Sequence, residues 1–515
     1  MGYDKILTAQ LKAGFSYGFD LGYRSFPNSD KNIENSVSTS EHPDVVDKAL
    51  EKEVCKGRMV GPLKEIPFTQ YQINPLAIVP KKSGEYRLIT NLSSPAGNSI
   101  NDAIHDIFAE VHYASIKDAL KILLVLGKGA FLAKTDVKSA FRLIPVSPEQ
   151  YHLLCYKWQG HFYIDKCLPM GARSSCQIFE RFSTSLEFIV KQLGCPLVIH
   201  YLDDFLFLSS TEQGCRKALK TFQFLAEDIG LPLAPEKTVL PSCCVEFLGY
   251  EIDTSEEIIR LPNDKILKGI KLLEDLLYNK YATLQELQAV AGFLNFACAV
   301  MVPGRAYMNC FYSLMAKLKM PFHRTKIKDE AKEDIRMWLK FFSQYNGVSF
   351  YREQMFLSQE KVHIFSDASK TLGFGGWLGT EWFSGEWPSE WYLRQNIVLL
   401  EMIPVLIALK LYSSHLLNKV AVLHIDNEAL VAVLNNMKSK EPLVMNFVRQ
   451  VVLYSMKYNF LIKAVHVVGA ENYLADKLSR SQVAAFLKAH PTANPCPTAF
   501  KMLPAQLSCK SRLLD

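Results

Sequence analysis

Two adjacent aspartates stand between two runs of strand-forming residues in VIHYLDDFLFLSS, residues 198–210. This feature constrains the fold most, because two apolar strands separated by so few residues form a hairpin. The turn of such a hairpin is normally built from Gly, Asn or a single Asp. Asp203 and Asp204 therefore indicate either a hairpin with an acidic tip or a cation site, and other segments must distinguish these alternatives.

Length and texture divide the chain into several regions. Its 515 residues are too many for a single hydrophobic core, and at about 150 residues per domain we expect three or four units. We expect a polar, weakly periodic N-terminal extension over 1–60, in which NSDKNIENSVSTSEH (residues 28–42) is loop or disorder. Strands and helices are expected over 61–253, a helical region over 254–345, further strands and helices over 360–481, and a Pro-containing linker over 482–515.

Local patterns predict particular elements inside these regions. LLCYKWQGHFYIDKC indicates a hairpin with Gln159 and Gly160 at its turn, followed by a helix with apolar residues at helical spacing between Phe179 and Leu193. Residues 264–345 are predicted to be helical throughout. Within them, Thr283 is expected to cap a helix, with Glu286 three residues on.

Composition restricts the class of protein. The chain is 49% hydrophobic and 21% charged, and it has no uninterrupted apolar run of about 20 residues and no signal-peptide pattern at its start. Its twelve cysteines are scattered without a C-x-x-C, which favours reduced thiols. We expect an intracellular protein, in cytoplasm or nucleus. The basic stretch 318–340 fits a solvated helix face and a nucleic-acid contact equally well.

A third carboxylate belongs with the two of the hairpin. Asp136 stands where the strand in FLAKTDVKSAFRLIPVS ends, and alone it would be a cap or turn residue. Side chains alternate along a strand, so we expect Asp203 rather than Asp204 to be the principal partner of Asp136. Carboxylates that repel one another in apolar surroundings need a divalent cation. Mg²⁺ fits, and two ions about 4 Å apart would suit phosphoryl transfer.

The motif YLDD, residues 201–204, resembles the Y-x-D-D motif of reverse transcriptases, and the flanking segments resemble the same family in the same order. These segments are LAIVPKKSGEYRLITNL, TDVKSAFRLIP, LPMGARSSCQIF, LAPEKTVL and VEFLGYEID. The resemblance implies a polymerase right hand of fingers, palm and thumb, in which Asp136, Asp203 and Asp204 are the catalytic, metal-binding aspartates.

The same resemblance implies further site residues. Lys82, Arg87 and Tyr201 would bind the incoming nucleotide, Gly171 would line its pocket, and Phe141 would be the steric gate that excludes a ribose 2′-OH. Lys237 would donate a proton to the leaving pyrophosphate, and Leu248 with Gly249 would form the primer grip.

A second group of acids lies in residues 360–481. Glu401 is a single acid in the apolar stretch NIVLLEMIPVLIAL, where an unpaired charge would cost several kcal/mol. Asp367 and Asp426 follow apolar strands, and Asp476 lies in ENYLADKLSR. Each acid alone could be a cap or a surface residue. Together their order resembles the D-E-D-D set of the RNase H family.

That resemblance implies an α/β RNase H-like domain whose four acids bind two Mg²⁺ ions and hydrolyse the RNA of an RNA–DNA hybrid. His466, which precedes Asp476, is expected to end a strand rather than to act in catalysis. The whole constellation implies Mg²⁺ as cofactor, with Mn²⁺ as a substitute, and an RNA template, a DNA primer, the hybrid and dNTPs as partners.

Other segments look most like retrotransposons of the DIRS type, namely CKGRMVGPL, RLITNLSSPAGNSINDAI, LNFACAVMVPGRAYM and NYLADKLSR. Those elements also encode a tyrosine recombinase, for which the residues after Arg480 leave no room, so we expect a fragment or a shortened derivative. An inactive nucleic-acid-binding derivative retained by a host is the alternative. An RNA-synthesising polymerase is disfavoured by the bulk of Phe141.

Overall fold

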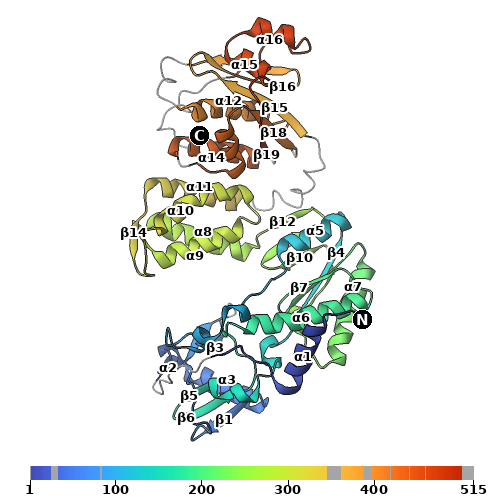
Figure 1. Ribbon diagram of the computed structural model, residues 1–515, viewed down its shortest axis with the longest axis vertical. Coiled ribbons are helices and arrows are strands. Elements are labelled where there is room, and N and C mark those ends of the chain that lie inside the picture. Colours follow the sequence, from blue (N-terminus) through green and yellow to red (C-terminus); the bar gives the residue numbers. More distant parts are fainter. Residues whose placement is uncertain are drawn as a thin grey trace. The chain divides into compact units, whose positions relative to one another are not determined.

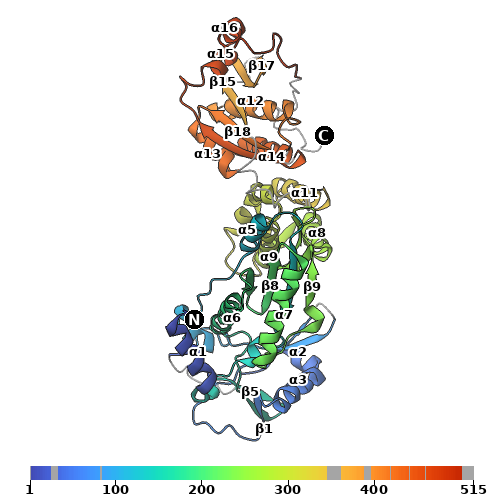
Figure 2. The ribbon, with the colours of Figure 1, turned by 90° about the vertical axis from the view of Figure 1, so that its right-hand side faces the viewer.

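The computed structural model describes residues 2–24, 33–81, 84–344, 361–387, 396–417, 419–439, 441–458 and 460–500. The chain divides into two compact units, Met1–Leu248 and Gly249–Asp515, which Figures 1 and 2 show in two views. The break between the units lies close to the boundary expected after residue 253. In the described ranges, no helix combines the length and the apolar composition needed to cross a membrane.

The first unit mixes helices and short strands. Its helices are α1 (Lys5–Tyr17), α2 (Val37–Glu41), α3 (Pro43–Cys55), α4 (Ile100–Ala103), α5 (Ile116–Leu126), α6 (Ser175–Gln192) and α7 (Glu212–Asp228), with 3₁₀ turns η1 (Asp106–Phe108), η2 (Ala140–Leu143), η3 (Pro148–Leu153) and η4 (Pro235–Lys237). Its strands are β1 (Met59–Leu63), β2 (Leu76–Pro80), β3 (Tyr86–Thr90), β4 (Phe131–Asp136), β5 (Cys155–Trp158), β6 (His161–Asp165), β7 (Val198–Tyr201), β8 (Asp204–Ser209), β9 (Val239–Ser242) and β10 (Cys244–Phe247).

A four-stranded antiparallel sheet of order β7-β8-β4-β9 forms the centre of this unit, with α6 and α7 packed against it. Side chains alternate along β8, so Phe205 and Phe207 share one face, where both rings lie against Phe222 of α7. The antiparallel register sets Asp136, at the end of β4, opposite Asp204, at the start of β8. Two segments far apart in sequence therefore meet at one end of the sheet.

Local predictions in the first unit are confirmed. β5 and β6 form the expected hairpin, and both Gln159 and Gly160 at its turn have positive φ (44° and 78°). α6 buries Phe179, Leu186 and Val190 along one face, as the apolar spacing predicts. The spacing of apolar residues and the residue types of a turn are local properties of the sequence, which explains why the sequence predicts these elements.

The N-terminal extension has more structure than the sequence predicts. Loop or disorder over residues 28–42 is wrong for α2, which lies inside that stretch, and the weakly periodic residues on either side of it form α1 and α3. α1 begins after Asp4, whose carboxylate accepts hydrogen bonds from the amides of Ile6 and Leu7. α3 buries Val46 and Leu50 beside Trp158 of β5. With only two buried positions α3 has little periodicity, and its packing partner lies far along the chain.

The second unit has a helical part followed by a larger sheet. Its helices are α8 (Asn263–Tyr278), α9 (Leu284–Ala297), α10 (Asn309–Met315), α11 (Asp329–Gln344), α12 (Ile397–Leu411), α13 (Glu428–Asn436), α14 (Pro442–Lys457), α15 (Tyr473–Ser479) and α16 (Val483–Ala489), with the 3₁₀ turn η5 (Val302–Tyr307). Its strands are β11 (Tyr250–Asp253), β12 (Ile258–Arg260), β13 (Tyr281–Thr283), β14 (Arg324–Lys326), β15 (Lys361–Ala368), β16 (Gly373–Leu378), β17 (Glu381–Glu386), β18 (Val420–Ile425) and β19 (Leu461–His466).

In the helical part, the predicted cap of α9 is confirmed, but the predicted continuous helical structure is not. The Thr283 hydroxyl accepts from the Glu286 amide, and the Glu286 carboxylate accepts from the Thr283 amide, which completes a capping box. Helix throughout residues 264–345 is wrong, because β13 pairs with β14. Strands of three residues leave no periodic signal, and their pairing joins segments on either side of α9 and α10.

A five-stranded mixed sheet of order β17-β16-β15-β18-β19 dominates the rest of the unit. β15 pairs antiparallel with β16 and parallel with β18, which in turn pairs parallel with β19. α12 is apolar around most of its circumference and packs on β15, β16 and α14 (Figure 1). Glu401 is thereby carried into the interior, next to the sheet.

The C-terminal segment is not linker throughout. Residues 483–489 of the expected linker 482–515 form α16, where Phe486 is buried with its ring centroid 5.4 Å from that of Trp382. The prolines that suggested a linker follow this helix, and residues 501–515 lie outside the described residues. The short helix is stabilised by a contact with β17, which the local sequence does not reveal.

Candidate active sites

The acidic hairpin is the first candidate site. β7 ends at Tyr201 and β8 begins at Asp204, so Leu202 and Asp203 form a two-residue turn, with φ of 53° at Leu202. Tyr201 and Asp204 are paired across the hairpin. Asp203 thus belongs to the turn and Asp204 to the strand that follows it, so simple alternation of side chains along a strand does not apply to this pair.

Asp136 meets the hairpin at the same end of the sheet. It is 6% exposed, and its carbonyl accepts from the Ala234 amide (2.9 Å). The next residue, Val137, donates its amide to the Asp203 carbonyl (3.0 Å). These backbone bonds place β4, the acidic turn and the segment before η4 side by side.

Burial and mutual repulsion raise the pKa values of the hairpin acids. Burial, followed by the charge of Asp136, raises the pKa of Asp203. The pKa of Asp204 is raised to about 6, mainly by burial. The charge of Lys134 lowers this pKa, whereas the charges of Asp136 and Asp203 raise it further. The sequence names Asp203 as principal partner of Asp136, and that pairing stays a prediction.

Lys237 places a cation among these acids. Its Nζ donates to Asp136 Oδ2 at 2.7 Å. Burial lowers the pKa of Lys237, but the hydrogen bond to Asp136 and the charges of all three aspartates outweigh it and raise the pKa. The ammonium lies where three carboxylates attract positive charge, which is the electrostatic setting that a divalent cation would require.

A buried ionic cluster under the hairpin was missed by sequence reasoning. His200 of β7 lies between two carboxylates of α6, with Nε2 3.2 Å from Glu180 Oε1 and Nδ1 2.5 Å from Glu187 Oε2. Burial lowers the pKa of His200, but the two carboxylates raise it to about 9. The Leu202 amide donates to Glu180 Oε2 at 3.2 Å. A signal existed, because Glu180 and Glu187 are seven residues apart on the apolar side of a helix.

The expected nucleotide-binding residues lie in separate elements of the first unit. Phe141 of η2 is half-buried, with its ring centroid 5.4 Å from that of Phe179. Tyr201 is half-buried against Tyr113 (4.7 Å between centroids). Arg87 is exposed on β3, and Lys82 lies outside the described residues.

Backbone geometry explains glycine at two of the expected positions. Gly171 has φ of 103°, and a Cβ there would lie 3.3 Å from the Thr90 carbonyl oxygen, so a side chain would be strained and crowded. Leu248 and Gly249 have φ of 51° and 78°, a turn for which the second residue suits glycine. Their role as primer grip stays a prediction.

The second candidate site brings three acids together in the second unit. Asp367 lies near the end of β15, Glu401 on α12 and Asp426 directly after β18. One carboxylate oxygen of each lies within 4.8 Å of the others. Among the described residues this is the one group of three acids, histidines or cysteines that meets that distance, so Asp136, Asp203 and Asp204 are more widely spaced.

These three acids cannot all be ionised cheaply without a cation. Burial, followed by the charges of Asp367 and Asp426, raises the pKa of Glu401 to about 10. Burial raises the pKa of Asp367 to about 6. Glu401 Oε2 is buried and forms no hydrogen bond with any described residue. A buried, unpartnered carboxylate oxygen on a side chain grouped with two further acids fits a divalent cation.

Asp476 is near this group but outside it. Its Oδ1 accepts from Arg480 Nε at 2.7 Å, and its side chain is 42% exposed. Its charge contributes to the raised pKa of Asp367, although burial contributes more. The structure thus brings three of the four expected acids together. His466 ends β19, as the sequence predicts.

Comparison with known proteins agrees with the first site. Residues 79–252 match the family described as reverse transcriptase (RNA-dependent DNA polymerase). The Pro-Pol polyprotein of Feline foamy virus is 26% identical over 244 residues, 47% of this chain and 18% of that polyprotein. The enzymatic polyprotein of Cauliflower mosaic virus (strain Strasbourg) is 26% identical over 418 residues, 78% of this chain and 56% of that polyprotein. The chain spans less than two thirds of either relative.

A solved structure shows the same fold. The foamy viral protease-reverse transcriptase dRH in complex with double-stranded DNA has a TM-score of 0.53 and 15% sequence identity, covering 90% of this chain and 79% of its own. The polymerase right-hand fold expected from the sequence is consistent with this likeness. Residues 79–252 are thus similar to reverse transcriptases, and Asp136, Asp203 and Asp204 all lie inside this matched range.

Proposed function

We propose that this protein is an RNA-directed DNA polymerase with a second, RNase H-like nuclease site, which copies the RNA of a DIRS-type retrotransposon into DNA and degrades the RNA of the hybrid. One observation carries the proposal. Asp136 and the Asp203–Asp204 turn meet at one end of a sheet, inside the range that matches reverse transcriptases.

Asp136, Asp203 and Asp204 would hold Mg²⁺ at the polymerase site, and Asp367, Glu401 and Asp426, with Asp476 nearby, would hold it at the nuclease site. When bound, two such ions, or Mn²⁺ in their place, would neutralise phosphate charge and stabilise the attacking and leaving oxygens. The raised pKa values of Asp204 and Glu401 support this assignment, because a bound cation would offset both the burial and the repulsion between carboxylates that raise them.

The remaining residues of the first site would bind and orient the substrates. Lys237 is a protonated ammonium held beside Asp136, so it would be placed to donate a proton to the leaving pyrophosphate. Arg87 and Lys82 would bind the triphosphate. Phe141 would lie beneath the sugar, and Gly171 and Tyr201 would line the pocket. RNA template, DNA primer, RNA–DNA hybrid and dNTPs are the partners that such a site requires.

The nuclease assignment rests on topology together with chemistry. An RNase H fold is expected to have three antiparallel strands followed by two parallel ones, as β15 to β19 do. Its acids are expected on the first strand, on the buried helix and after the fourth strand, which are the positions of Asp367, Glu401 and Asp426. The shallow minor groove of the hybrid exposes the 2′-OH by which RNA is recognised. Basic side chains would contribute contacts to the phosphate backbone.

Primer extension tests the polymerase proposal. A DNA primer on an RNA template is incubated with dNTPs and Mg²⁺ and either the intact chain or Asp203→Asn, and extension is expected only with the intact chain. If the intact chain binds the hybrid but extends no primer with Mg²⁺ or Mn²⁺, the alternative of an inactive nucleic-acid-binding derivative is supported instead.

Phe141→Val is expected to admit ribonucleotides. Removing the ring opens space beside the sugar, so ribonucleotide incorporation relative to deoxynucleotide should rise by about tenfold to a hundredfold. Single-nucleotide incorporation with dNTP and rNTP measures the ratio. Phe182→Val is the matched control, since Phe182 also packs on Phe179 (5.9 Å) but belongs to α6. An unchanged ratio in Phe141→Val would make residue 141 a core residue only.

Glu180→Ala is expected to slow polymerisation about tenfold, equivalent to ~1.4 kcal/mol, with little change in the KM for dNTP. The reason is that the Leu202 amide loses its acceptor, so the turn that presents Asp203 is less well held. The polymerisation rate of Glu180→Gln should lie between those of wild type and Glu180→Ala. Its amide oxygen can still accept from the Leu202 amide, but it no longer neutralises the charge of His200. Glu212→Ala, at an exposed pair with Arg216, is the control. Wild-type kcat in Glu180→Ala would contradict this role.

A further inference from the structure

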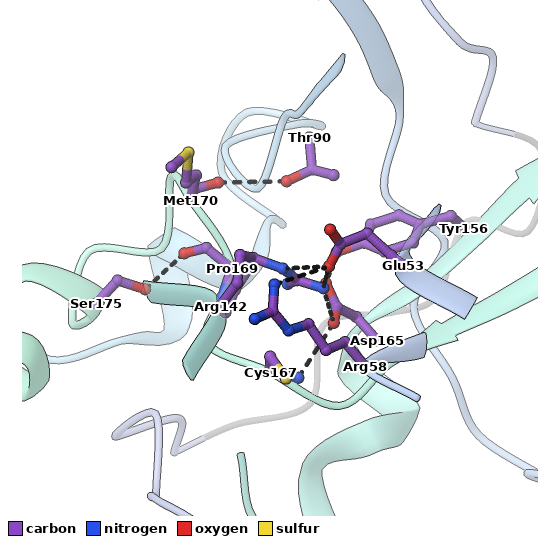
Figure 3. A network of polar contacts seen from close by, with 10 residues as sticks. All are labelled: Glu53, Arg58, Thr90, Arg142, Tyr156, Asp165, Cys167, Pro169, Met170 and Ser175. Carbon is purple, nitrogen blue, oxygen red and sulfur yellow. Dashed lines mark hydrogen bonds and ion pairs between the residues drawn. The ribbon is translucent and has the colours of Figure 1, made fainter. Parts of the chain in front are cut away.

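A buried polar network surrounds Arg142, the residue next to Phe141. Arg142 donates from Nη1 to Asp165 Oδ2 (2.6 Å) and from Nη2 to Asp165 Oδ1 (2.9 Å), a two-pronged ion pair. Its Nε and Nη2 each lie 3.0 Å from Glu53 Oε2, and Arg58 approaches the same carboxylate. Figure 3 shows Glu53 of α3, Arg142 of η2 and Asp165 of β6 converging, with Arg58, which lies between α3 and β1, beside them.

The network is deeply enclosed. The Asp165 side chain is 4% exposed and that of Arg142 is 14% exposed. A buried ion pair contributes little net stability, because removing both charges from water offsets their attraction. The planar Arg142 guanidinium presents its donors in a rigid arrangement. Its role is therefore better explained by the positions that it fixes for its partners than by added stability.

On one side, the network fixes the turn that carries Phe141. η2 is a single short turn, entered through Ser139 at φ of 61° and closed by bonds from the Arg142 amide to the Ser139 carbonyl (2.8 Å) and from the Ile144 amide to the Phe141 carbonyl (3.2 Å). So short a turn has few bonds of its own. Three hydrogen bonds from the Arg142 guanidinium therefore anchor this turn next to Phe141.

On the other side, the network holds the loop that leads to Gly171. Asp165 Oδ1 also accepts from the Cys167 amide (3.1 Å), and the Leu168 amide donates to the Ile144 carbonyl (2.8 Å). Beyond Leu168, the Pro169 carbonyl accepts from the Ser175 hydroxyl (2.7 Å) and the Met170 carbonyl from the Thr90 hydroxyl (3.3 Å), as Figure 3 shows. Asp165 thus ties the Phe141 turn to the loop before Gly171.

We infer that the ion pair between Arg142 and Asp165 is a positioning device for sugar discrimination, which keeps the Phe141 ring and the loop before Gly171 at a fixed separation. The inference rests on the proposed function, in which Phe141 and Gly171 are two walls of the nucleotide pocket. Arg142 itself touches no substrate. It acts through Phe141, so its effect should disappear when the ring is removed.

A double-mutant cycle tests this inference. Arg142→Lys keeps the charge but loses the fork, and we expect ribonucleotide incorporation relative to deoxynucleotide to rise about tenfold, while the deoxynucleotide rate changes less. Single-turnover incorporation of one dNTP and the matching rNTP is measured for wild type, Arg142→Lys, Phe141→Val and the double variant. Because Arg142 acts through the ring, the double variant should discriminate no worse than Phe141→Val.

Controls separate positioning from general loss of structure. Arg216→Lys makes the same change at an exposed pair on α7 and should leave the sugar ratio unchanged. Melting temperatures are recorded for every variant. If Arg142→Lys does not fold, Glu53→Gln removes one partner while keeping the pair with Asp165, and it should shift the ratio in the same direction by a smaller factor.

Each other outcome overturns the inference. Equal slowing of both nucleotides by Arg142→Lys would mean a structural role only. If the two single changes alter the ribonucleotide-to-deoxynucleotide ratio by factors that multiply in the double variant, Arg142 acts independently of Phe141. If wild type extends primers but Phe141→Val leaves the ratio unchanged, the gate assignment fails and the inference fails with it. Absence of any extension by wild type would instead remove the proposed polymerase function.

Discussion

Asp203→Asn is expected to lower DNA synthesis on an RNA template by more than about a hundredfold, and Asp136→Asn to do the same. Each change removes a carboxylate from a cluster in which burial and mutual charge raise the pKa values of Asp203 and Asp204. An amide keeps the shape of the side chain but cannot compensate a divalent cation. Primer extension under single-turnover conditions with saturating Mg²⁺ measures the loss.

Hybrid binding should survive both changes, because affinity for nucleic acid comes from basic and backbone contacts rather than from the metal site. Asp44→Asn is the matched control, since Asp44 is exposed on α3 and pairs only with Lys48 among the described residues. Polymerisation above about a hundredth of wild type in either variant would refute the assignment of these aspartates as metal ligands.

Glu401→Gln is expected to stop hydrolysis of RNA in an RNA–DNA hybrid and to spare primer extension. Glu401 belongs to a three-acid cluster in the unit Gly249–Asp515, whereas Asp136 and Asp203 belong to the unit Met1–Leu248, so the two sites share no carboxylate. The loss should again exceed about a hundredfold, since a ligand of the reacting centre is removed. Cleavage of a labelled RNA strand and primer extension are measured on one preparation.

Glu428→Gln is the matched control for this site. Glu428 begins α13 close to Asp426 in sequence, but its side chain is 85% exposed. Undiminished hydrolysis by Glu401→Gln would remove Glu401 from the nuclease site. A parallel fall in hydrolysis, extension and melting temperature would mean that Glu401 is a buried structural acid.

The pKa of Glu401 adds a pH-dependent signature. Without a cation, the folded chain holds a proton on Glu401 up to a pKa of about 10, whereas the unfolded chain loses it near 4.5. The folded state therefore binds more protons across this window, and its free energy of unfolding falls as pH rises. In EDTA at pH 8, Glu401→Gln should melt no lower than wild type. Added Mg²⁺ should raise the melting temperature of wild type by more than that of the variant.

Local features of this fold follow from the sequence alone. The β5–β6 hairpin, the apolar face of α6 and the capping box of Thr283 and Glu286 each depend on residues a few positions apart. The candidate acids also follow from the sequence, because their positions at strand ends or inside an apolar helix, taken together in order, resemble known motifs. Their spacing along the chain is enough to indicate two separate sites.

Tertiary structure alone decided which groups support those acids and the turn that carries Phe141. Glu180 holds the Leu202 turn and Arg142 pairs with Asp165 through contacts between elements that no local pattern relates. The helices α3 and α16 likewise depend on Trp158 and Trp382, which lie on distant strands. The physical reason is that burial and ion pairing depend on distance in space, whereas periodicity and turn chemistry depend on distance along the chain.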